Sequence, residues 1–217
     1  MLTAVAYKAV CISSEDGAGA ADAAQLVATR LGFRLIDEDI VTRAAVEAGV
    51  DQEVVADVER RKSLVARLLE GMGPASMATG YVVIDGSYGQ PASDELRGLI
   101  QSVIEDTATA GNVVIVAHAA SLALGERGDV LRVFVTASPQ TRQRRLAGSL
   151  QLDEKEAARL IKRSDAGRAD YIRRFYGIGA ERPTHYDLVI NTDKLTSDDA
   201  ARLIVEAATG SASAEAA

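Results

Sequence analysis

The chain of 217 residues contains no tryptophan, a single cysteine and four prolines, and aromatic residues make up only 4% of it. One cysteine excludes a disulfide within the chain and is typical of a reducing compartment, so we expect a cytoplasmic protein. Cys11 lies in an apolar stretch, where we expect it to act as a small buried hydrophobic residue rather than as a nucleophile. With so few aromatic residues, the core is expected to consist of alanine, valine, leucine and isoleucine.

Several kinds of site and segment are also missing. The two histidines, His118 and His185, are isolated, and no spacing typical of metal ligands occurs, so no metal site made by the protein alone is expected. No apolar run is long enough to span a membrane, and the N-terminus lacks the pattern of a signal peptide. The formal net charge of −7 disfavours general binding to nucleic acid.

Predicted strands and helices alternate along the chain. We expect strands at residues 4–12, 33–37, 112–117, 131–136 and 187–191, and helices at residues 21–31, 38–48, 51–69, 93–110, 153–162 and 196–208. This alternation predicts an α/β fold of three layers, in which helices cover both faces of a parallel sheet. The length predicts one domain over residues 1–209, followed by a disordered tail at residues 210–217.

The predicted helix at residues 51–69 carries an apolar stripe. Such a stripe is typical of a helix that packs on its own core. The alternative is a contact surface for a partner protein, including a second copy of the chain in a homodimer.

Residues 13–20, with the sequence Ser-Ser-Glu-Asp-Gly-Ala-Gly-Ala, connect the first predicted strand to the first predicted helix. The N-terminus of a helix attracts anions through its bare N–H groups, and small residues let a phosphate approach the backbone. A full phosphate-binding loop has a lysine after its last glycine, whereas here Ala20 follows Gly19. The loop alone also fits an ordinary tight turn between a strand and a helix.

The most basic part of the chain is residues 142–174. A capping box at residues 153–156 predicts the start of a helix there. Arg163 and Arg168 are five positions apart, so they are not neighbours on a straight helix. We predict a bend near Gly167 that brings both guanidinium groups to one anion, because planar guanidinium groups suit phosphate oxygens. For most of the other cations in this segment, a solvated helix face is the better interpretation.

Four segments resemble, in order and spacing, motifs of the cytidylate-kinase-like family of nucleoside monophosphate kinases. They are ISSEDGAG at residues 12–19, LGFRLID at residues 31–37, VVIVAHAA at residues 113–120, and the stretch from Leu152 to Tyr171 together with YDLVINT at residues 186–192. The last of these is similar to the mobile lid and final strand of the family, and it is the most specific part of the match.

The resemblance implies a P-loop kinase-like fold with about five parallel strands. It also implies a monophosphate-binding insert within residues 38–110 and a helical lid at about residues 142–180. The implied reaction is transfer of a phosphoryl group from ATP, with Mg²⁺, to a nucleoside monophosphate such as CMP or dCMP. Nucleotides are therefore the implied partners.

The resemblance also implies roles for individual residues. The nucleotide-binding set is Ser13, Ser14, Gly17, Ala18, Gly19, Ala20, Ala21 and Asp22; the catalytic set is Arg163, Asp165 and Arg168; and the substrate-binding set is Asp37, His118 and Tyr171. Ser13 and Asp22 are placed to help hold Mg²⁺ or its waters. Asp37 equally fits a helix cap after a strand. Asp85 is a rival acid at a strand end, which we rank lower because no phosphate-site residue accompanies it.

The chain departs from the family at positions that usually carry positive charge. Ser14, Ala21 and His118 each stand where the family has an arginine. Removing one electrostatic contact to a reacting group typically costs about 2–4 kcal/mol of barrier, so two losses bring a kinase close to inactivity. The first hypothesis is a kinase that is weak or has an unusual substrate. The second is a non-catalytic nucleotide-binding or regulatory protein, and the third is a protein that acts through protein contacts alone.

Ala20 and Ala21 leave the loop with backbone donors only, so we predict weak binding of ATP by the wild-type protein. Ala21→Arg restores a cation at the position where the family has one, and we expect it to tighten ATP binding or raise turnover, as measured by titration calorimetry and a kinase assay. Tight wild-type binding that Ala21→Arg weakens would contradict the prediction and indicate a loop adapted to another ligand.

Overall fold

The computed structural model describes residues 6–37, 94–117 and 119–210. They contain a five-stranded sheet with the strand order β2-β3-β1-β4-β5, in which every neighbouring pair is parallel. The strands are β1 (Ala9–Ser14), β2 (Arg34–Asp37), β3 (Val113–Val116), β4 (Val130–Thr136) and β5 (Leu188–Asn191). This sheet confirms the predicted α/β fold.

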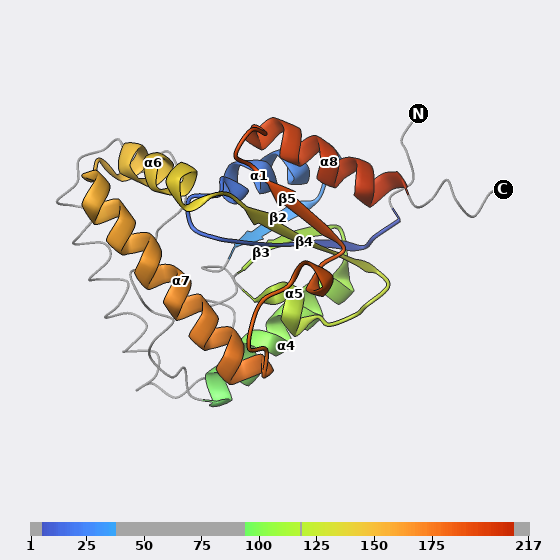
Figure 1. Ribbon diagram of the computed structural model, residues 1–217. Coiled ribbons are helices and arrows are strands. Elements are labelled where there is room, and N and C mark those ends of the chain that lie inside the picture. The colour runs from blue at the N-terminus through green and yellow to red at the C-terminus, as the bar shows by residue number, and fades with distance from the viewer. Residues whose placement is uncertain (1–5, 38–93, 118, 211–217) are drawn as a thin grey trace.

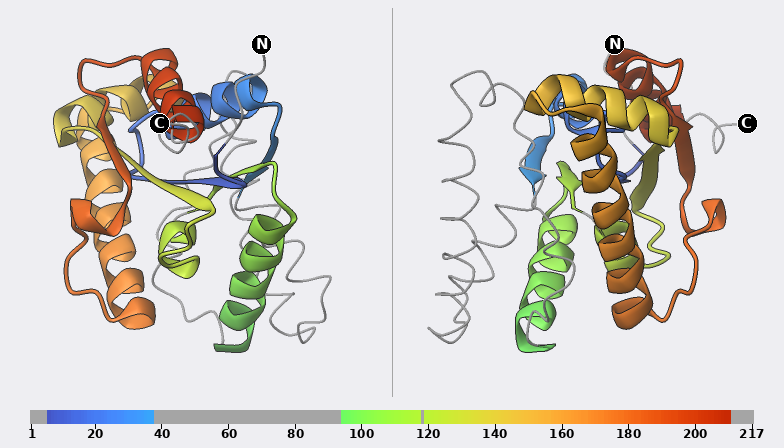
Figure 2. Two further views of the ribbon diagram at one scale, coloured as in Figure 1. Left: turned by 90° about the vertical axis from the view of Figure 1, so that its right-hand side faces the viewer. Right: turned by 60° about the vertical axis from the view of Figure 1, so that its left-hand side comes forward.

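Helices cover both faces of the sheet (Figures 1 and 2). One face is covered by α1 (Ala20–Leu31) and α8 (Ser197–Gly210), and the other by α4 (Asp94–Ala110) and the short α5 (Ala120–Ala123). After β4 the chain forms α6 (Pro139–Leu150) and the long α7 (Glu154–Tyr176), which pack on each other, and a short 3₁₀ helix (Pro183–His185) precedes β5. The three predicted layers are therefore confirmed.

The central strand, β1, is buried along its whole length. Its side chains alternate, so that Val10 and Ile12 pack in the core under α1 and α8, while Ala9 and Cys11 pack in the core under α4 and α5. Burial raises the pKa of the Cys11 thiol to about 12, which agrees with its predicted role as a hydrophobic residue.

Strand β1 differs from its predicted span of residues 4–12. It begins at Ala9 and continues through Ser13 and Ser14, because these two residues pair with Phe134 and Val135 of β4. The two serines therefore end the strand rather than begin the loop.

The predicted bend near Gly167 is wrong, because α7 continues without interruption from Glu154 to Tyr176. One buried stripe runs through the helix at Ala157, Leu160, Ile161, Ser164, Arg168 and Ile172. A glycine inside a helix costs only about 1 kcal/mol, and the packing along this stripe outweighs it.

The predicted capping box between Asp153 and Glu156 is present at the start of α7, and Thr196 and Asp199 form a similar reciprocal pair of hydrogen bonds at the start of α8. The predicted helices at residues 38–48 and 51–69, the rival acid Asp85 and residues 211–217 of the predicted tail lie outside the described residues, whereas Gly210, the first residue of that predicted tail, is the last residue of α8. Within the described residues, no helix is long and apolar enough to cross a membrane. That residues 1–209 form one domain stays a prediction.

Gly17→Ala tests how tightly the loop after β1 packs on α6. Gly17 has a φ of +79°, and a Cβ at this position would lie 2.8 Å from the carbonyl oxygen of Arg142. We expect a loss of about 1–3 kcal/mol in the free energy of unfolding, measured by urea denaturation. The control, Gly148→Ala in α6, meets no atom within 4 Å and is expected to be neutral or stabilising. Equal stability of the two variants would contradict this packing.

Candidate functional site

The loop of residues 15–19 connects the carboxyl end of the central strand to α1. Gly17 and Gly19 both have left-handed backbone conformations, with φ of +79° and +81°. Ala18 lies between them fully buried, and its N–H donates to the carbonyl oxygen of Glu15 at 3.1 Å. The result is a compact turn at the edge of the sheet where ligands of parallel α/β proteins bind.

The carbonyl oxygens of this turn and of Ser14 accept hydrogen bonds from side chains of other elements. The donors are Arg168 to Ser14 (3.2 Å), Arg142 to Asp16 (2.7 Å), Arg145 to Gly17 (3.3 Å), Thr192 to Ala18 (2.7 Å) and Ser197 to Gly19 (3.4 Å). These side chains belong to α6, α7, α8 and the connection after β5. The carbonyl oxygens therefore face the surrounding helices.

The N–H groups at the start of α1 are available for a ligand. Those of Gly19, Ala20 and Ala21 have no acceptor among the described residues, and no side chain caps the helix. Such N–H groups, together with the helix dipole, attract an anion. These free N–H groups are consistent with the predicted phosphate-binding loop, and that the loop binds a phosphate stays a prediction.

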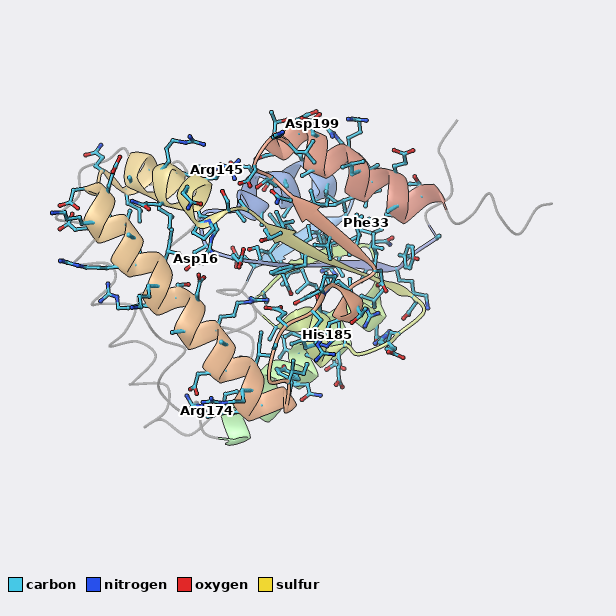
Figure 3. The ribbon with its side chains drawn as sticks, in the orientation of Figure 1. Asp16, Phe33, Arg145, Arg174, His185 and Asp199 are labelled. Carbon is cyan, nitrogen blue, oxygen red and sulfur yellow. The ribbon has the colours of Figure 1, made fainter. Side chains whose placement is uncertain are left out.

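A buried arginine ties this loop to the long helix α7. Arg142 of α6 is only 1% exposed, and its guanidinium group forms a bidentate ion pair with Asp165 (2.6 and 3.1 Å). A second carboxylate, that of Glu15, lies 3.4 Å away. The carboxylate of Asp16 accepts a hydrogen bond from the Ser164 hydroxyl, which joins the loop directly to α7. Figure 3 shows Asp16 and Arg145 where the loop meets α6 and α7.

A second buried arginine lies further along α7. Arg168 forms a bidentate ion pair with Glu181 (2.6 and 2.9 Å) and contacts the Tyr186 hydroxyl and the Phe134 ring. Burial acts to lower the pKa of Arg168, but the hydrogen bond and charge of Glu181 outweigh it and raise this pKa, so Arg168 stays charged. Burial also raises the pKa of Tyr186, which keeps its phenol neutral.

A cavity of about 210 Å³ lies between α7, the loop and the segment after α7. Its lining residues are Glu15, Asp165, Arg168, Ala169, Ile172, Ile178, Gly179, Ala180 and Glu181. The charged part of this lining has more carboxylates than guanidinium groups. An anion that enters the cavity therefore has to compete with Glu181 for Arg168.

The structure brings some of the predicted catalytic residues to the loop and separates others. Asp165 pairs with Arg142, which donates to the carbonyl oxygen of Asp16 in the loop. Arg168 donates to the carbonyl oxygen of Ser14, just before the loop. Arg163 is exposed, since five residues of a helix correspond to a turn of about 140° away from buried Arg168.

The other predicted residues are placed as follows. The Ser13 hydroxyl is buried 3.0 Å from that of Ser121 in α5, whereas Asp22 is exposed in the first turn of α1. Asp37 is exposed at the carboxyl end of the edge strand β2. The ring of Tyr171 packs against Phe175, with centroids 4.6 Å apart. His118 lies outside the described residues. The roles assigned to these residues stay predictions.

Sequence reasoning did not single out Arg142, Arg145, Thr192 or Glu181. The first two are three positions apart, which places them on one side of a helix, and this spacing was the available signal. Nothing in the sequence marks Glu181, because it lies in an irregular connection.

The sheet order, the glycine turn after the central strand and the adjoining helices α6 and α7 define a P-loop kinase-like α/β protein. The chain belongs to the cytidylate kinase-like family, whose family model matches residues 9–194.

Two curated relatives, each named cytidylate kinase, come from Pyrobaculum arsenaticum and Pyrobaculum neutrophilum. They are 30% and 29% identical to this chain over 116 and 113 residues, which are 53% and 52% of this chain. The chain spans only 62% and 60% of their lengths. The crystal structure of an uncharacterized protein from Eubacterium ventriosum matches 92% of this chain and 96% of its own with a TM-score of 0.65. Its sequence identity is 16%, so it shows the fold alone.

The variants Arg168→Leu and Arg163→Leu compare how much two arginines, both predicted to be catalytic, contribute to stability. Loss of Arg168 leaves the half-buried Glu181 without its guanidinium partner, so we expect about 3–5 kcal/mol lower stability. Loss of the exposed Arg163 is expected to cost less than about 1 kcal/mol. Urea denaturation measures both, and equal small losses would mean that Arg168 contributes no more to stability than the exposed Arg163.

Proposed function

We propose that this chain is a nucleoside monophosphate kinase, which transfers a phosphoryl group from ATP to a monophosphate such as CMP or dCMP. The observation that carries the proposal is the orientation of the loop after β1. Side chains of other elements donate hydrogen bonds to its carbonyl oxygens, and the N–H groups of Gly19, Ala20 and Ala21 are left for an anion. Family membership supports the same reaction.

Phosphoryl transfer depends on holding the phosphates in line and on positive charge around the moving group. In the proposed reaction, the loop N–H groups bind the donor phosphates. Arg168 and Arg142 supply the nearby positive charge, although each already has a carboxylate partner. Phosphate oxygens therefore gain less from these arginines than from arginines without such partners.

Mg²⁺ bound with ATP would offset charge on the phosphates. The described residues contain no group of three or more side chains able to hold a metal ion, which fits a cation bound mainly by phosphate oxygens and water. Asp22 is exposed beside the loop and is the proposed protein ligand for such a water. The Ser13 hydroxyl is less suited, because it is buried against Ser121.

We place the acceptor between the loop and the carboxyl end of β2. Asp37, at that end, is the proposed acceptor of a hydrogen bond from the monophosphate, with His118 and Tyr171 as further proposed contacts. The proposed insert within residues 38–110 and the proposed lid at residues 142–180 would enclose this substrate.

The alternative function is a non-catalytic nucleotide-binding or regulatory protein. Ala20 and Ala21 put no cation in the loop itself, and both buried arginines are already paired with carboxylates. These two features favour binding of a nucleotide without efficient transfer.

A coupled assay of ADP release decides between the two functions. The protein is given ATP and Mg²⁺ with each of a panel of monophosphates, and the binding of ATP and CMP is measured separately. We expect ADP release that depends on CMP or dCMP. Nucleotide binding without ADP release would favour the non-catalytic alternative, and absence of both would contradict the proposal.

Gly19→Ala and Gly32→Ala form a matched pair for this assay. Both glycines have left-handed conformations, at opposite ends of α1, so an alanine is strained at either position. Only Gly19 belongs to the loop. We expect Gly19→Ala to lower turnover at least about tenfold and Gly32→Ala to leave it near the wild-type value. Equal effects would place the reaction away from this loop.

A further inference from the structure

We propose that Thr192 and Arg145 are positioning residues that aim the backbone N–H groups of the loop at its anion, and that Arg145 supplies the positive charge that Ala20 and Ala21 lack. This inference rests on the proposed function, because it assumes that the loop binds phosphate. Neither residue is expected to react with the substrate.

Thr192 follows β5 and is 2% exposed. Its hydroxyl oxygen lies 2.7 Å from the carbonyl oxygen of Ala18 and 3.2 Å from that of Thr136. The backbone N–H of Thr192 already donates to Thr136 at 2.8 Å. A hydroxyl has one hydrogen, so we assign it to the closer acceptor, Ala18.

Arg145 strengthens this contact and adds a second one. Its Nη1 atom donates to the Thr192 hydroxyl at 2.9 Å and to the carbonyl oxygen of Gly17 at 3.3 Å, while Nη2 donates to the carbonyl oxygen of Thr192 at 2.7 Å. A hydroxyl that accepts a hydrogen bond from a cation is polarised, and it becomes a stronger donor.

The charge of Arg145 is also placed differently from those of Arg142 and Arg168. Within the described part of the chain, Arg145 has no carboxylate partner. Its Nη1 atom lies 3.7 Å from the place that a Cβ of Gly19 would occupy. An uncompensated guanidinium group therefore lies at the loop, although the loop sequence carries no cation.

Peptide planarity links these contacts to the direction of the N–H groups. In a trans peptide the carbonyl of one residue and the N–H of the next point in opposite directions, and the described chain has no cis peptide. Holding the Ala18 carbonyl toward Thr192 therefore turns the Gly19 N–H to the opposite side. In the same way, Ser197 holds the Gly19 carbonyl and directs the N–H of Ala20.

The test is titration calorimetry with tripolyphosphate, which has no base or sugar, and in parallel with ATP and Mg²⁺. Thr192→Val removes the hydroxyl, and we expect about five- to tenfold weaker binding of both ligands. Thr192→Ser keeps the hydroxyl and is expected to bind within about twofold of wild type. This recovery by serine is a result that a purely structural role of the threonine side chain does not require.

Arg145→Leu has a matched control in Arg144→Leu, which removes the same charge from an exposed position of the same helix. We expect binding to weaken about tenfold or more for Arg145→Leu, and by no more than about twofold for Arg144→Leu. Arg145→Leu and Arg144→Leu therefore still test the inference if Thr192→Val does not fold.

The possible outcomes separate the inference from the proposed function. If wild type binds and Thr192→Val and Arg145→Leu bind as well as their controls, the inference is overturned while phosphate binding at the loop stands. If wild type binds neither tripolyphosphate nor ATP at millimolar concentration, the proposed function fails and the inference fails with it.

Discussion

The burial of the Arg142 guanidinium group is the constraint on which the rest of the site depends. A charge removed from water is destabilising unless it is paired and its hydrogen-bond donors find acceptors. Arg142 meets this requirement only where Asp165, Glu15 and the backbone of Asp16 converge. The loop, α6 and α7 must therefore fold as one unit, and the Gly17 turn packs against α6 as a result.

The same ion pairs set how strongly the arginines of the site attract an anion. The carboxylates that permit Arg142 and Arg168 to be buried also neutralise them, so these arginines attract phosphate less than their number suggests. Attraction then depends on backbone dipoles and on Arg145, which has no carboxylate partner among the described residues. In the proposed function, the loop binds phosphate through the orientation of its N–H groups rather than through its own side-chain charge, and Ala20 and Ala21 are compatible with such binding.

Much of the fold could be predicted from the sequence, whereas the contacts within the site could not. Apolar strands such as 113–116 and the capping box at Asp153 are local signals, and the structure confirms them. Gly167 is a local signal for a bend, but packing along the whole of α7 prevents that bend. The hydrogen bonds from Arg142 to Asp16 and from Thr192 to Ala18 join residues 126 and 174 positions apart, and no local pattern specifies such pairs.

The distance along the chain between the loop and its donors has a consequence for synthesis. The loop residues are made early, but Thr192 and Ser197, which hold two of its carbonyl oxygens, are made 174 and 178 residues after the residues whose carbonyls they hold. Closing contacts of this length costs chain entropy, which the packed sheet has to offset first. The loop therefore cannot take its final shape until β5 and α8 have been made and have docked on the sheet.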